Sequence, residues 1–170
     1  AWWAIPGPER PTLADRLQSG PLPTFQALKV AAAIGDALSA VHATGIVLGA
    51  LSAADVGLAH CTVPGWVGGP IDGSMDPRSD VYRLGVLWFS AMTGMAPNAD
   101  ADLSLIRLAG LDPLVEDEAY ELLSAMLDPN PDRRPYPFGP IVDRLRDLAA
   151  TCTFSAVPPL PYPNTGTEAA

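Results

Sequence analysis

The fold of this chain is decided by the stretch from Asp76 to Gly94, which reads DPRSDVYRLGVLWFSAMTG. Leu84 and Trp88 belong to an apolar stripe at helical spacing, and further apolar residues lie off that stripe. Asp76 followed by Pro77 is typical of a helix start, and Gly94 is placed to end the helix. A helix that is apolar nearly all round is normally buried, so we expect this one at the centre of the domain.

Two further helices are expected before this stretch. Thr12 and Asp15 form a capping-box pattern for a short helix that runs through Leu17. Thr24 opens a long apolar pattern that Gly45 is placed to end. This second pattern predicts a buried helix of about five turns.

The remaining elements are shorter. Apolar pieces at 46–48, 56–58 and 62–63 predict one or two short hairpin strands. After the central helix we expect a helix near 101–108 and a helix with the acidic residues 116–118 in its first turn, where they favour the positive end of the helix dipole. A last helix is expected from about Pro140. The predicted fold class is therefore mainly α.

Composition limits what the chain can do. It has 170 residues, 48% of them apolar, which suits one globular domain. The 19 acidic and 10 basic residues give a net charge of −9, so its field repels nucleic acid and acidic lipid surfaces. Cys61 and Cys152 lack the spacing of a metal site or a disulfide framework, which favours a cytoplasmic location. No apolar run is long enough to suggest membrane insertion within this segment.

Three motifs, in the right order, resemble the C-terminal lobe of a protein kinase, in particular bacterial serine/threonine kinases and the pseudokinases of actinobacteria. They are residues 79–94, similar to the family's central helix F, residues 37–47, similar to the end of the helix before the catalytic loop, and residues 127–135, similar to the turn between the last two helices. The resemblance implies a strand and hinge remnant over 1–8, a helical C-lobe over 9–150 with the N-lobe largely absent, and a Pro-rich tail over 151–170.

The resemblance also assigns structural and degenerate positions. Asp80 would hold the backbone of the catalytic loop, and Arg134 would pair with a glutamate that this chain lacks, leaving it to find another carboxylate or to stay solvated. Ala50 stands where the family has its catalytic base, and a methyl group cannot accept a proton. Ser52 replaces the lysine of the same loop, so only Asp55 keeps a capacity for a cation.

The nucleotide site implied by the family is also incomplete. Residues 63–68 occupy the place of the metal-binding Asp-Phe-Gly and include no acid. No glycine-rich phosphate loop precedes the hinge region, and the single lysine, Lys29, lies on the first long helix. We therefore expect no catalytic residue, no bound metal and no cofactor.

Each candidate residue also has a simpler reading. Asp55 could be a turn-capping residue rather than a metal ligand, and His42 could be structural rather than a general base. Trp2, Trp3 and Ile5 are the candidate partner-binding residues, on which an N-lobe or a partner chain would pack, unless they mark a boundary within a larger domain.

The leading hypothesis is a catalytically inactive pseudokinase module that acts in signalling through an unidentified protein partner. It would be cytoplasmic or the cytoplasmic part of a membrane-anchored protein. The alternatives are a cropped or atypical serine/threonine kinase that uses residues around Asp55, and a purely structural helical module.

Overall fold

The computed structural model describes residues 11–58, 69–70, 76–97 and 113–152. The described chain is mainly helical, as predicted. Its elements are α1 (Leu13–Leu17), α2 (Thr24–Ala43), β1 (Ile46–Val47), β2 (Gly69–Pro70), α3 (Arg78–Thr93), α4 (Pro113–Met126), the 3-10 turn η2 (Pro131–Arg133) and α5 (Phe138–Thr151). The expected segment 1–8, the helix near 101–108 and the tail from 153 lie outside the described residues.

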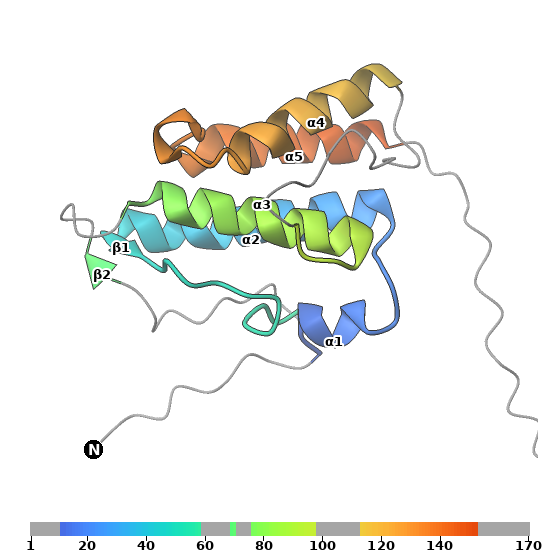
Figure 1. Ribbon diagram of the computed structural model, residues 1–170, viewed down its shortest axis with the longest axis horizontal. Helices are drawn as coiled ribbons and strands as arrows, with labels where there is room; N and C mark the ends of the chain where they lie inside the picture. The colour runs from blue at the N-terminus through green and yellow to red at the C-terminus, as the bar shows by residue number, and fades with distance from the viewer. Residues whose placement is uncertain (1–10, 59–68, 71–75, 98–112, 153–170) are drawn as a thin grey trace, which may run out of the picture.

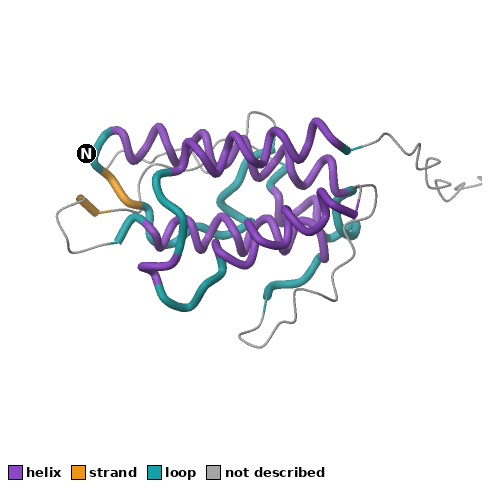
Figure 2. Tube along the Cα trace, turned by 90° about the horizontal axis from the view of Figure 1, so that it is seen from above, coloured by secondary structure: helices purple, strands orange, loops and turns teal. Residues whose placement is uncertain are grey.

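The long helices form two layers (Figure 1). α4 and α5 lie over α2 and α3, and α1 lies on the opposite side of the α2–α3 layer. The most extensive contact joins α2 to α5, while α3 packs on both α2 and α4. Seen from above, the axes of the long helices are roughly parallel (Figure 2), and the colours of Figure 1 show that α2 and α3 run in opposite directions. α3 thus lies between α2 and α4, which agrees with the central position that its sequence predicts.

The central helix buries residues on most of its faces. Leu84, Leu87, Trp88 and Phe89 are all buried. Gly94 ends the helix with φ 74°, the left-handed conformation that glycine adopts without strain. The start differs slightly from the prediction, because Pro77 is the cap residue and the helix begins one position later. This helix supplies part of the core and packs against α2 and α4.

The N-terminal capping box is confirmed. Thr12 Oγ1 accepts a hydrogen bond from the Asp15 amide at 3.1 Å, and Asp15 Oδ2 accepts one from the Thr12 amide at 3.0 Å. α2 begins at Thr24, where its pattern predicts, and ends at Ala43.

One local prediction was wrong, because α4 begins at Pro113 and Glu116 alone of the acidic residues 116–118 lies in its first turn. α5 begins at Phe138, two residues before the expected start near Pro140. Of the three apolar pieces expected to supply one or two strands, 46–48 contains β1, which pairs antiparallel with β2. Residues 56–58 form no regular strand, since Gly57 makes only an isolated bridge to Thr12, and residues 62–63 lie outside the described residues.

Helices α2 and α5 approach closely at a glycine. A Cβ atom placed on Gly35 would lie 2.6 Å from Cγ2 of Val142 on α5. Side-chain carbons cannot approach that closely, so glycine permits this separation of the two helices. The packing brings the C-terminal end of α2, with His42, beside the start of α5.

Candidate functional site

The candidate site is the loop that follows β1, residues 48–55, which is anchored by one buried carboxylate. Asp80, on the first turn of α3, is fully buried. Its Oδ2 accepts a hydrogen bond from the Leu48 amide at 2.8 Å, and its Oδ1 accepts one from the Gly49 amide at 2.6 Å. Hydrogen bonds from buried amides to a charged acceptor are among the stronger ones in proteins. Asp80 therefore holds the backbone at the start of this loop.

The same carboxylate also contacts the end of α2. His42 Nε2 lies 2.8 Å from Asp80 Oδ2, and the imidazole edge packs on the Phe138 ring with centroids 5.0 Å apart. Because the Asp80 oxygens act as acceptors here, the imidazole donates to Oδ2 from Nε2. His42 Nδ1 is buried without a partner among the described residues. His42 thus braces Asp80 and is not displayed to solvent as a general base.

Buried side chains and backbone hydrogen bonds also fix the path of the loop. Leu48 and Leu51 are buried in the core, at 2% and 5% exposure. At the far end, the Leu13 amide donates to the Val56 carbonyl at 2.8 Å, and the Ala14 amide donates to the Ala53 carbonyl at 2.9 Å. Asp80 therefore holds the N-terminal end of the loop, and the start of α1 holds its C-terminal end.

The side chains displayed by this loop carry little chemistry. Ala50 is exposed and offers only a methyl group. Asp55 Oδ2 accepts hydrogen bonds from the Ser52 hydroxyl at 2.6 Å and from the Ser52 amide at 2.9 Å. Asp55 is thus a turn-capping residue, which agrees with the simpler of its two readings.

Arg134 corrects one expectation, because it neither pairs with a described carboxylate nor stays solvated. Its guanidinium donates to three carbonyls: Nε to Asp128 at 2.7 Å, and the two terminal nitrogens to Arg78 and Pro129 at 3.2 Å. The same group lies over the Tyr82 ring, 4.8 Å from its centroid. Carbonyl dipoles satisfy its donors, so Arg134 joins the η2 turn to α3 without a counter-charge from the described residues.

The geometry gives no support for a metal centre. Within ranges 11–58, 69–70, 76–97 and 113–152, no three His, Cys, Asp or Glu side chains lie close enough together to hold a metal ion. Cys152 follows α5, and burial raises the pKa of its thiol. That direction disfavours the reactive thiolate form.

The three candidate partner-binding residues cannot be placed, and two residues that contact Arg134 were not predicted from the sequence. Trp2, Trp3 and Ile5 lie outside the described residues. The sequence reading missed Tyr82 as the ring beneath Arg134 and gave no role to Arg78, whose carbonyl Arg134 uses. Both contacts cross from η2 to α3, and nothing in the local sequence around either residue signals them.

No protein-family model matches the chain, and no curated protein matches it either. In the part of the chain that the structure describes, none of the helices combines the length and apolarity needed to cross a bilayer.

Proposed function

We propose that this chain is a catalytically inactive kinase-like module that acts by protein–protein contact, without ATP-dependent phosphoryl transfer. The observation that carries the proposal is the loop held by Asp80, in which Ala50 is exposed and offers only a methyl group. The resemblance assigns the catalytic base of a kinase to this position. Phosphoryl transfer needs a group there that orients or accepts the substrate hydroxyl, and alanine has none.

The contacts around the loop support the resemblance to the structural part of a kinase C-lobe. The fully buried carboxylate of Asp80, its contact with His42 and the packing of the central helix hold the loop in place. A buried polar network of this kind can stabilise the fold of a protein that has no catalytic activity. A chain that keeps the frame of the loop and loses its reactive side chains fits a binding or scaffolding role.

The remaining acid of the loop gives the kinase alternative little support. Asp55 would have to bind magnesium, but its Oδ2 is already engaged by two groups of Ser52. Magnesium sites in kinases also draw on a second carboxylate, which the sequence does not supply in residues 63–68. The net charge of −9 favours a protein over nucleic acid or acidic lipid as the partner. The two cysteines, which lack the spacing of a disulfide framework, favour a cytoplasmic location for the module.

Thermal denaturation with ATP tests the nucleotide part of this proposal. The melting temperature should stay unchanged in millimolar ATP, with magnesium or with manganese. A ligand at about 100 times its Kd stabilises the folded state by about 2.7 kcal/mol, which corresponds to several degrees for a domain of this size. A clear ATP-dependent rise would contradict the proposal.

A further inference from the structure

A surface hollow of about 360 Å³ is lined by α1, by the first turns of α2 and by Leu58, and it is named here the α1–α2 hollow. Its apolar wall includes Phe25, Val30 and Leu58, which are half-buried and pack against the core. The exposed parts of these side chains are in contact with water that a bound partner would displace. The volume lies within the range of ligand-binding pockets.

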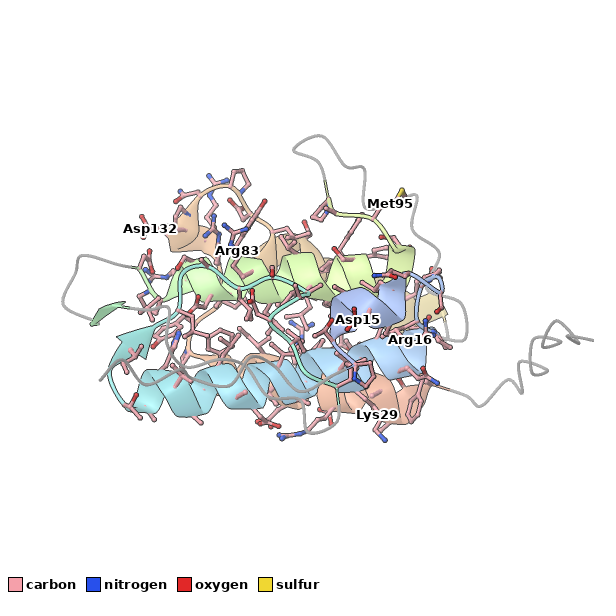
Figure 3. The ribbon with its side chains drawn as sticks, turned by 90° about the horizontal axis from the view of Figure 1, so that it is seen from below. Asp15, Arg16, Lys29, Arg83, Met95 and Asp132 are labelled. Atoms are coloured by element: carbon pink, nitrogen blue, oxygen red, sulfur yellow. The ribbon has the colours of Figure 1, made fainter. Side chains whose placement is uncertain are left out.

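The charged side chains that line the α1–α2 hollow are basic. Arg16 and Lys29 line it, and no acidic residue of the described ranges does. Figure 3 shows Arg16 on α1 and Lys29 on α2 at the same end of the molecule. Arg16 Nη1 donates to the Gly20 carbonyl at 3.1 Å, which leaves Nε and Nη2 without a partner among the described residues. Asp15, the neighbour of Arg16 in the sequence, accepts the Thr12 amide instead.

Lys29 is the second cation of the hollow. Its side chain is exposed, and its ammonium lies 4.9 Å from the centroid of the Phe25 ring, with no carboxylate of the described residues in ion-pair contact. A contact with a ring face leaves the ammonium donors available to an oxygen ligand. On α5, by contrast, Arg146 is paired with Asp36 at 2.6 Å. In a chain of net charge −9, the α1–α2 hollow therefore presents positive charge that its own acids leave unpaired.

A second hollow, of about 350 Å³, adjoins the first between α2 and α5. Phe25 and Lys29 line both hollows, so the two are continuous, and together they are named here the Lys29 groove. The acid that lines the second hollow, Asp36, is neutralised by Arg146. The rest of its wall is largely made of alanines, which are Ala32, Ala33, Ala149 and Ala150. The groove thus combines a positively charged part with an apolar extension.

From this arrangement we infer that the Lys29 groove docks a segment of a partner protein in which an acidic side chain lies beside apolar ones. Arg16 and Lys29 bind the carboxylate through charge-assisted hydrogen bonds, and the apolar walls cover the neighbouring side chains. A polypeptide fits better than a fatty acid because exposed residues, Gln26 and Lys29, line the groove. On that open side a peptide backbone stays hydrated, whereas an acyl chain would remain in contact with water.

The docked segment belongs to the protein partner that the proposed function requires, so this inference rests on that proposal while using residues remote from the loop at Ala50. The test is fluorescence anisotropy of the whole chain with a labelled peptide mixture, in which a central glutamate is flanked by leucine or phenylalanine and the outer positions are degenerate. One matched mixture has glutamine in place of the glutamate, and a second has serine in place of the apolar residues. Decanoate serves as a competitor.

The test variant combines Gln26→Glu with Lys29→Gln, which removes one cation of the groove and adds an acid. Both residues are exposed on α2, and the contact of Arg16 with Gly20 is left in place. The control variant combines Arg83→Gln with Arg133→Gln, which lowers the net charge by the same amount at exposed positions that do not line the groove. Circular dichroism checks that both variants stay folded.

The glutamate mixture should bind, and each matched mixture should bind at least about fivefold more weakly, because one loses the carboxylate and the other the apolar contacts. The test variant should bind the glutamate mixture at least about tenfold more weakly, since attraction is replaced by repulsion of like charges. The control variant should change the Kd by less than about twofold at physiological salt, where distant charges are screened.

Four outcomes would overturn the inference. They are absence of binding by the glutamate mixture, equal binding of either matched mixture, equal weakening in the control variant, and displacement of the peptide by decanoate at the affinity of the peptide itself. The third would reduce the effect to net charge, and the fourth would mark a site for fatty acids. ATP binding or phosphoryl transfer would refute the proposed function without changing any of these results, so the two failures are distinguishable.

Discussion

The replacement Asp80→Ala should be strongly destabilising, because it removes the acceptor of three buried or half-buried donors. The Leu48 amide at 2.8 Å, the Gly49 amide at 2.6 Å and His42 Nε2 at 2.8 Å all lose their partner. Leaving a buried donor unsatisfied costs about 1–3 kcal/mol. The Leu48 amide and His42 Nε2 carry that cost in full, whereas the half-buried Gly49 can recover part of its hydrogen bond from water.

The expected loss in the free energy of unfolding is therefore about 3–5 kcal/mol. For a chain of this length, that corresponds to a fall in melting temperature of about 8–15 °C. Urea denaturation followed by circular dichroism measures the free energy, and amide hydrogen exchange at Leu48 and Gly49 reports the loop directly. Both amides should lose protection before the helices do.

The matched control is Asp36→Ala, which removes a carboxylate from α2. Asp36 pairs with Arg146 at 2.6 Å, but both side chains are about half exposed. An exposed pair contributes about 1 kcal/mol or less. If Asp80→Ala costs no more than Asp36→Ala, or if protection at Leu48 and Gly49 persists, the anchoring role of Asp80 is refuted.

Three further predictions concern packing, capping and thiol reactivity. Gly35→Ala should cost about 1–3 kcal/mol in denaturant unfolding, because its Cβ would meet Val142 at 2.6 Å; an unchanged midpoint would show that α2 and α5 can separate freely. Thr12→Ala should cost about 1 kcal/mol by removing the cap of α1, and a neutral result would assign that helix end to tertiary contacts alone. In a Cys61→Ser background, iodoacetamide should alkylate Cys152 more slowly at neutral pH than it alkylates free cysteine. The reason is that burial raises the pKa of the Cys152 thiol and so lowers its thiolate fraction; a faster rate would contradict this.

The local features of the fold could be predicted because their causes are local. The capping box at Thr12 needs only residues three apart, and the ends of α3 follow from Pro77 and Gly94. The start of α5 lies two residues before the position near Pro140 that the sequence predicts. Proline fits throughout the first turn, where backbone amides have no partner within the helix, and the helix begins two residues earlier.

The contacts that define the site depend on distant parts of the chain. The resemblance to kinases implied that Asp80 holds the loop, but residues 38 apart meet in the His42–Asp80 contact, and no spacing rule predicts it. Arg134 does not need the carboxylate partner that the sequence suggested. The backbone carbonyls of Asp128, just after α4, and of Arg78, at the start of α3, accept its hydrogen bonds. Side-chain to backbone contacts of this kind carry no signature in residue type.

The central claim, that the module transfers no phosphate, is tested most directly by incubating the chain with radiolabelled ATP, magnesium or manganese, and a mixed serine and threonine peptide library. We expect no incorporation into the protein or the peptides above the level of an Asp55→Ala variant. Incorporation that the Asp55→Ala replacement abolishes would contradict it, because Asp55 would then be a working metal ligand rather than a turn cap.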